Sequence, residues 1–184
     1  MFNQKIVEGL SKSSMIRAMF EEGEKLKKIH GAENVFDFSI GNPDVEPPKE
    51  VQEAIAKYAS HSEPGLHRYM SNAGFADVRL KVAQFLQKKS GVELTANHLV
   101  MVCGAAAGLN ITLKALLNPG EEVMVISPFF VEYLSYIDNA GGKPVIVKAQ
   151  KDSFQLDVDA ISQAITTKTK TILLNSPNNP TGVV

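Results

Sequence analysis

Two short segments of this sequence carry residues that could bind a ligand. Residues 104–108 are glycine or alanine only, and small residues at the start of a helix leave its backbone N–H groups open to a phosphate. Residues 175–182, Asn-Ser-Pro-Asn-Asn-Pro-Thr-Gly, are polar, and their side-chain amides can orient a ligand oxygen. The small-residue segment alone is also typical of close helix packing. The prediction of a ligand site therefore depends on both segments together.

A third segment, Ser127-Pro128-Phe129-Phe130, places two aromatic residues directly after an apolar run. Either of them alone would be expected in the core. The chain lacks the Gly-Lys-Ser/Thr of a P-loop and the Gly-x-Gly-x-x-Gly of a dinucleotide site. Its four histidines share no metal-ligand spacing, and its single cysteine cannot complete a thiolate zinc site. We therefore expect no metal site.

The elements that must position these segments alternate between short apolar runs and amphipathic stretches. Near-continuous apolar runs separated by helices are typical of an α/β fold with a mainly parallel sheet flanked by helices. Ligands of such sheets gather at the carboxyl ends of the strands, where all three segments should lie. The expected strands are Leu99–Cys103, Val123–Ile126, Val145–Val147 and Thr171–Leu174, and the expected helices are Ala105–Leu117, Phe129–Asn139 and Val158–Ile165.

The N-terminal part differs, because helical periodicity dominates it. Apolar residues recur with a period near 3.6 over Ser14–His30, which predicts a helix that ends at Gly31. Alternating apolar residues over Phe36–Ile40 predict a strand. Further helices are expected after Pro47-Pro48 and between Phe75 and Gly91.

Taken together, the three segments resemble those of the class I and II aminotransferases, which are pyridoxal-phosphate (PLP) enzymes of fold type I. The resemblance runs from about residue 14 to the end of the chain. Its strongest part is Asn179-Pro180-Thr181-Gly182 after an apolar strand. Further matches are Ile40-Gly41-Asn42-Pro43-Asp44, then Tyr69 followed by Gly74 and Arg79, then Asn118-Pro119-Gly120-Glu121-Glu122.

The resemblance implies a role for each matching residue. Asn179 would donate a hydrogen bond to the phenolic oxygen of the cofactor, and Phe130 would stack on its ring. Gly104, Ala105 and Ala106 would hold the phosphate, with the backbone N–H groups of the two alanines as donors. In proteins of this kind the Ser127–Pro128 and Asn179–Pro180 peptide bonds are cis.

Two further residues imply contacts with substrate and with a second chain. Gly41 matches the glycine that lets the backbone approach the substrate carboxylate. Tyr69 matches a tyrosine that reaches the cofactor phosphate of the neighbouring subunit, which implies a homodimer. The resemblance also divides the chain into an N-terminal arm and small-domain segment, residues 1–46, and an incomplete large PLP-binding domain, residues 47–184.

No catalytic residue is predicted within the chain. The Schiff-base lysine of the family lies downstream of its Asn-Pro-Thr-Gly string, and Val184 follows that string here almost directly. The full protein is expected to transfer an amino group between an L-amino acid and a 2-oxo acid such as 2-oxoglutarate, in amino-acid biosynthesis. The 184-residue chain alone is expected to be inactive. The alternatives are a PLP-dependent carbon–sulfur β-lyase and a non-catalytic fragment that binds PLP or dimerises.

Composition indicates which classes of partner and which cellular compartment to expect. The net charge of −1 lacks the positive excess that nucleic-acid binding needs, and 44% hydrophobic residues are typical of a globular protein. One cysteine indicates a reducing compartment, and the N-terminus carries no apolar signal segment. No apolar run is long enough to span a bilayer. We therefore expect a cytoplasmic protein that binds neither membranes nor nucleic acid.

Overall fold

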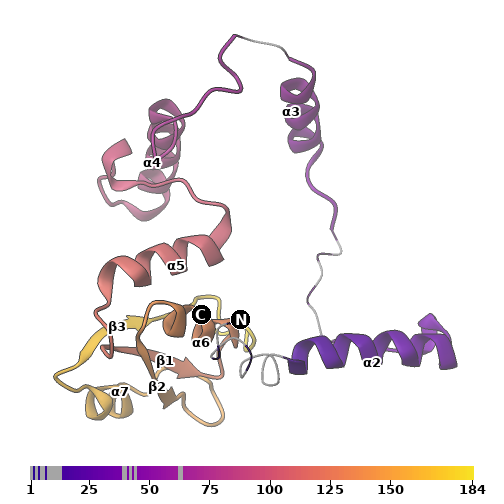
Figure 1. Cartoon of the computed structure of the whole chain (residues 1–184), viewed down its shortest axis with the longest axis vertical. Coiled ribbons are helices and arrows are strands. Elements are labelled where there is room, and N and C mark those ends of the chain that lie inside the picture. Colours follow the sequence, from indigo (N-terminus) through magenta and orange to yellow (C-terminus); the bar gives the residue numbers. More distant parts are fainter. Residues whose placement is uncertain are drawn as a thin grey trace. The chain divides into compact units, whose positions relative to one another are not determined.

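The computed structural model describes residues 2, 4, 7, 14–38, 41, 43, 45–61 and 64–184, with the backbone only for 14–17. The chain forms two compact units, Met1–His67 and Arg68–Val184, and each is described by itself. Figure 1 labels their helices and strands. The domain boundary after residue 46 stays a prediction.

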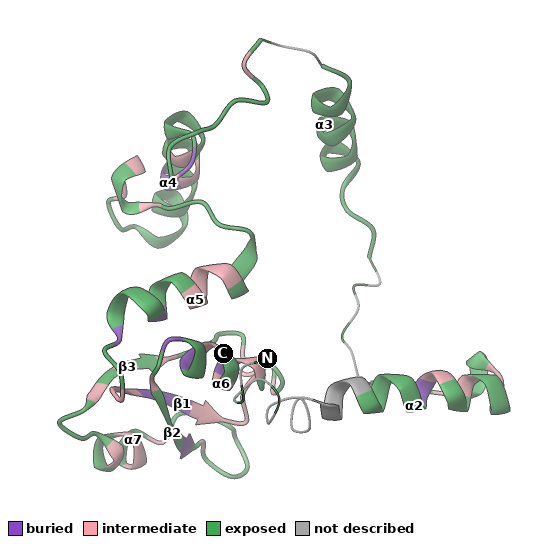
Figure 2. Cartoon of the chain, viewed as in Figure 1, coloured by how far each residue is buried: buried purple, intermediate pink, exposed green. Residues whose placement is uncertain are grey.

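The first unit is helical. Helix α2 spans Ser14–His30, as the periodicity predicted, and Lys27, Lys28 and His30 lie in its last turn, where positive charge complements the helix dipole. Gly31 follows with a φ of 85°, a conformation that favours glycine, and the short 3₁₀ helix η1 spans Ala32–Asn34. Helix α3, Lys49–Ser60, begins after Pro48 and has no buried residue (Figure 2).

The strand predicted at Phe36–Ile40 is wrong in the part that the structure describes. Residues 36–38 are not in a strand, and the side chains of Phe36 and Phe38 are 82% and 92% exposed. A strand requires a neighbour for its backbone N–H and C=O groups, and none of the described residues pairs with this segment. Ser39, Ile40, Asn42 and Asp44 lie outside the described residues.

The second unit begins with helix α4 (Ala76–Ser90), the short 3₁₀ helix η2 (Ala96–His98) and helix α5 (Gly104–Leu116). The Arg79 guanidinium links α4 to η2 and to the turn before α4, because it donates to the carbonyl oxygens of Ala96 at 2.6 Å and Gly74 at 3.3 Å. The strand predicted at Leu99–Cys103 is wrong. Its backbone makes isolated hydrogen bonds instead: Leu99 N–H donates to the carbonyl oxygen of Ala96 at 3.3 Å, and Met101 N–H donates to that of Ala73 at 2.9 Å. The segment joins no sheet of the described residues.

The sheet of the second unit is parallel, as predicted. Its strands are β1 (Glu122–Ser127), β2 (Lys143–Lys148) and β3 (Thr169–Leu173), in the order β2-β1-β3. β1 lies between its neighbours, with Val125 opposite Ile146 of β2 and Leu173 of β3. Helices α6 (Glu132–Asn139) and α7 (Val158–Ala164) connect the strands. The α/β class is therefore confirmed.

The core of this unit is built on β1. Val123, Met124 and Val125 are completely buried, and Val123 and Val125 pack in one cluster with α5 and α6 (Figure 2). The helices contribute Leu113, Tyr133 and Ile137 to this cluster. Burying each large aliphatic side chain stabilises the fold by about 1.5–3 kcal/mol, so β1 is the anchor of the unit.

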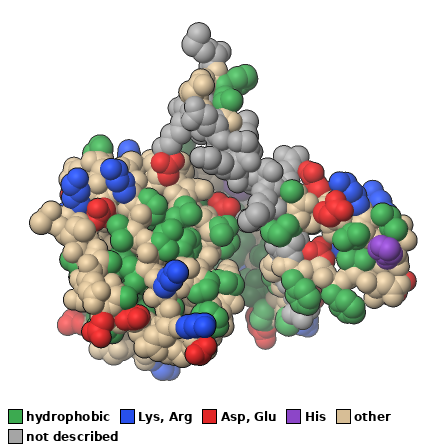
Figure 3. Space-filling view, turned by 90° about the horizontal axis from the view of Figure 1, so that it is seen from below, with side chains coloured by type: hydrophobic (Ala, Val, Ile, Leu, Met, Phe, Trp, Pro, Cys, Tyr) green, Lys and Arg blue, Asp and Glu red, His purple; other side chains and the backbone are tan. Residues whose placement is uncertain are grey.

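Many apolar side chains nevertheless reach the surface, over both parts of the chain visible in Figure 3. Among the described residues, no helix combines the length and the apolar character needed to cross a bilayer.

Candidate active site

The structure brings two of the predicted segments together at the carboxyl edge of the sheet. Residues 128–130 follow β1 and residues 174–182 follow β3, and β1 and β3 are parallel neighbours. Parallel strands end at the same edge, so both loops leave the sheet side by side. A hydrogen bond joins them, because the Asn178 side-chain amide donates to the carbonyl oxygen of Pro128 at 3.1 Å.

The loop that carries Asn179 is closed by its own hydrogen bonds. Asn179 N–H donates to Oδ1 of Asn175 at 2.8 Å, and Gly182 N–H donates to the carbonyl oxygen of Asn178 at 2.7 Å. The Asn179 side chain is exposed and has no hydrogen-bond partner among the residues that the structure describes. The loop thus holds the backbone of Asn179 and leaves its amide available for a ligand.

Phe130 lies at the start of the connection from β1 to α6. Its ring meets the Tyr133 ring edge-on, with centroids 5.6 Å apart and planes at 82°, which is a favourable aromatic arrangement. Phe130 is half-buried and packs against the core cluster. Burial raises the pKa of the Tyr133 phenol, so this neighbour stays neutral. Phe130 is therefore anchored on one side by the fold.

The predicted phosphate-binding residues, Gly104–Ala106, form the first turn of α5. Gly104 has a φ of 84°, and no atom lies within 4 Å of the position of a Cβ there, so the turn faces open space. Cys103 precedes the helix without capping it, and the first N–H groups of a helix have no partner within the helix. Among the described residues, no hydrogen bond joins this turn to the loops of Phe130 or Asn179.

The remaining two predicted residues, Tyr69 and Gly41, are not part of these loops. The Tyr69 side chain is fully exposed in the second unit. Gly41 belongs to the first unit, and no atom lies within 4 Å of the position of a Cβ on it. The predicted roles of both residues stay predictions.

A cavity of about 260 Å³ lies beside these loops and was not predicted from the sequence. Phe129, Tyr133 and Asn178 line it together with residues 154–156 of the loop between β2 and α7. Phe154 adopts a φ of 54°, which is uncommon for a bulky residue. Asp152 and Ser153 are residue types typical of turns, but nothing in the sequence of this loop indicates that Phe154 lines a cavity with Phe129, 25 residues earlier in the chain.

Within the described part of the chain, no group of three or more His, Cys, Asp or Glu residues is placed so that it could hold a metal ion.

Comparison with known proteins decides the family. The model of the family "Aminotransferase class I and II" matches residues 33–184, which is most of the chain. The chain belongs to the class I and II aminotransferases. It is 38% identical over 157 residues to an aspartate aminotransferase of Pyrococcus abyssi, covering 84% of this chain and 39% of that protein. It is 33% identical over 174 residues to aromatic-amino-acid aminotransferase 2 of Thermococcus litoralis, covering 93% and 42%.

Solved aminotransferases share the fold. A crystal structure of an aminotransferase from Eubacterium rectale aligns with a TM-score of 0.92 and 38% identity, covering all of this chain and 47% of that one. The chain therefore spans somewhat less than half the length of the aminotransferases it matches. The cis Ser127–Pro128 and Asn179–Pro180 peptide bonds agree with the resemblance, and Ser176–Pro177 is cis as well.

Members of this aminotransferase family use PLP, and the donors found here fit that group. The first turn of α5 offers backbone N–H groups flanked only by hydrogen or methyl side chains, which suits a phosphate. The unpartnered Asn179 amide suits a ring oxygen, and Phe130 supplies an aromatic face.

Proposed function

We propose that the full protein is a PLP-dependent aminotransferase that moves an amino group from an L-amino acid to a 2-oxo acid, with 2-oxoglutarate as acceptor. The observation that carries the proposal is the meeting of the Phe130 and Asn179 loops at one edge of the sheet, joined through Asn178 and Pro128. The chain spans only part of its relatives, so the activity is proposed for the whole protein.

The proposed roles follow from the chemistry of each group. PLP, when bound, supplies an electron sink for the α-carbon of the amino acid. Phe130 would hold one face of the ring, and its edge-on contact with Tyr133 fixes the orientation that it offers. Asn179 would donate its side-chain N–H to the phenolic oxygen. The backbone N–H groups of Ala105 and Ala106 would hold the phosphate at the positive end of α5.

Gly41 and Tyr69 extend the proposal to the substrate and to a second subunit. Gly41 has no side chain between its backbone and a substrate carboxylate, and Tyr69 is exposed and therefore able to reach another chain. We propose a homodimer in which Tyr69 contributes to the neighbouring site. A cytoplasmic location and a role in amino-acid biosynthesis belong to the same proposal.

The 184-residue chain by itself is proposed to be inactive. None of its described lysines makes a hydrogen bond or ion pair with residues 174–184. The loops offer groups that suit a cofactor, but no described lysine is hydrogen-bonded to them to shuttle a proton.

The test measures PLP binding and amino transfer by the full-length protein. Purified protein is titrated with PLP and then assayed with amino donors and 2-oxoglutarate for keto acid and glutamate. Release of ammonia and thiol from a sulfur-containing amino acid, without glutamate, would instead establish the β-lyase alternative. A full-length protein that neither binds PLP nor transfers an amino group would contradict the proposal.

A further inference from the structure

We propose that Asn178 is a positioning residue, which fixes the loop of Asn179 relative to the loop of Phe130; this inference rests on the proposed function. Its side-chain amide donates two hydrogen bonds, to the carbonyl oxygen of Pro128 at 3.1 Å and to Oγ1 of Thr181 at 2.9 Å. Both N–H groups of the amide are thereby used. One hydrogen bond contacts the loop of Phe130, and the other contacts the loop of Asn179.

The bond to Pro128 is the link between the two loops. Pro128 precedes Phe130 by two residues and lies 50 residues before Asn178 in the chain. Among the described residues, it is the one hydrogen bond between residues 128–131 and residues 174–184. The pairing of β1 with β3 ends at Val125 and Leu173, so the sheet itself does not continue this link.

The other contacts of Asn178 tie it to the Asn179 loop. Its backbone N–H donates to the carbonyl oxygen of Val183 at 2.8 Å, and its own carbonyl accepts from Gly182 N–H at 2.7 Å. The Thr181 hydroxyl that it contacts also accepts from Val183 N–H at 3.4 Å. Asn178 is therefore part of the closed loop and at the same time bonded to the other loop.

Position and chemistry both favour asparagine here. The side chain is half-buried at the wall of the cavity, where a hydrogen bond is less exposed to competition from water. An aspartate has the same shape but places an oxygen opposite the Pro128 carbonyl, so the donor is replaced by a repulsive contact. The Thr181 hydroxyl, in contrast, can turn and donate to a carboxylate. Asn178→Asp therefore breaks the link between loops and spares the contact within the loop.

The experiment compares Asn178→Asp with Asn97→Asp in the full-length protein. Asn97 is exposed and its side chain has no hydrogen-bond partner among the described residues, so it controls for the added charge. PLP affinity is measured by titration, and hydrogen exchange is followed in residues 128–131 and 178–183. We expect N178D to bind PLP about 10-fold more weakly, the effect of losing one well-placed hydrogen bond and adding a repulsion. Exchange should rise in both loops together, and N97D should match the unchanged protein.

Two outcomes would overturn the inference, and they are distinguishable. If the unchanged protein binds PLP and N178D binds it with the same affinity and the same loop exchange, Asn178 has no positioning role while the proposed function stands. If the unchanged protein does not bind PLP, the proposed function fails and the inference fails with it. Should N178D not fold, Asn178→Ala, which removes the amide without adding charge, takes its place with the same expected result.

Discussion

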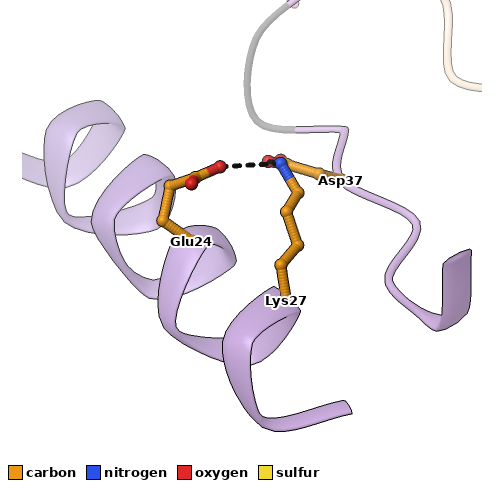
Figure 4. A network of polar contacts seen from close by, with 3 residues as sticks. All are labelled: Glu24, Lys27 and Asp37. Atoms are coloured by element: carbon orange, nitrogen blue, oxygen red, sulfur yellow. Dashed lines mark hydrogen bonds and ion pairs between the residues drawn. The ribbon is translucent and has the colours of Figure 1, made fainter. Parts of the chain in front are cut away.

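Lys27 of helix α2 forms an ion pair with Asp37, ten residues further along the chain, with 3.1 Å between Nζ and Oδ2. The same ammonium contacts Oε1 of Glu24 at 2.9 Å, so one positive charge lies between two carboxylates (Figure 4). The side chains of Lys27 and Asp37 are only 29% and 17% exposed. Gly23 allows the close approach, since a Cβ there would lie 2.8 Å from the Asp37 carboxylate. This contact ties the segment that leads toward Gly41 to α2.

Replacing Lys27 by methionine should loosen this segment. Lys27→Met keeps a long apolar stem but leaves the carboxylates of Glu24 and Asp37 without their shared cation. We expect the melting temperature to fall by a few degrees. Lys28→Met is the matched control, because Lys28 is exposed and has no ion-pair partner among the described residues. Equal melting temperatures for both variants would show that the pair contributes nothing.

The pH dependence of this contribution follows from the Lys27 ammonium. The hydrogen bonds that the Lys27 ammonium donates, first to the Glu24 carboxylate and then to that of Asp37, raise the pKa of Lys27 above its ordinary value of 10.5. The group is more basic in the folded protein than in the unfolded chain, so its contribution is present in full below pH 10.5 and is lost as pH rises through the folded pKa. The difference in melting temperature between the unchanged protein and K27M should be constant near neutral pH and shrink above 10.5. A difference that grows with pH would contradict this.

Removing the Asn179 amide should separate ligand binding from stability. Its side chain is exposed and unpartnered among the described residues, so Asn179→Ala should leave the melting temperature of the PLP-free protein unchanged. Loss of one hydrogen bond to the ring oxygen should weaken PLP binding by about 10-fold, as measured by titration. An unchanged PLP affinity would remove Asn179 from the site.

Truncating Ile137 should test the core that supports the sheet. Ile137 is completely buried and packs in the cluster with Val123 and Val125, so Ile137→Ala removes packed atoms and leaves a cavity. We expect the free energy of unfolding to fall by about 2 to 5 kcal/mol, which would be measured as faster hydrogen exchange of the β1 amides. Ile111→Ala is the control, because Ile111 is 56% exposed on α5. Equal effects of the two substitutions would mean that β1 is not anchored by α6.

Local pattern determined much of this protein. The period near 3.6 located α2 at its observed bounds, and alternating apolar runs and helices predicted the parallel strands β1, β2 and β3. The polar string that ends in Asn179-Pro180-Thr181-Gly182 indicated the candidate site from residue types alone. These features are encoded by neighbours in the sequence, because helix and strand periods depend on which face of a short segment is apolar.

Pairing between distant segments was decided only by the tertiary structure. Leu99–Cys103 and residues 36–38 have the composition of strands but lie outside any sheet, because a strand exists only where another backbone accepts its hydrogen bonds. The bond from Asn178 to Pro128, the ion pair of Lys27 with Asp37 and the cavity beside Phe154 likewise join residues that are not sequence neighbours. A single sequence specifies residue types and their local periods, whereas the partner of each polar group depends on how the elements pack.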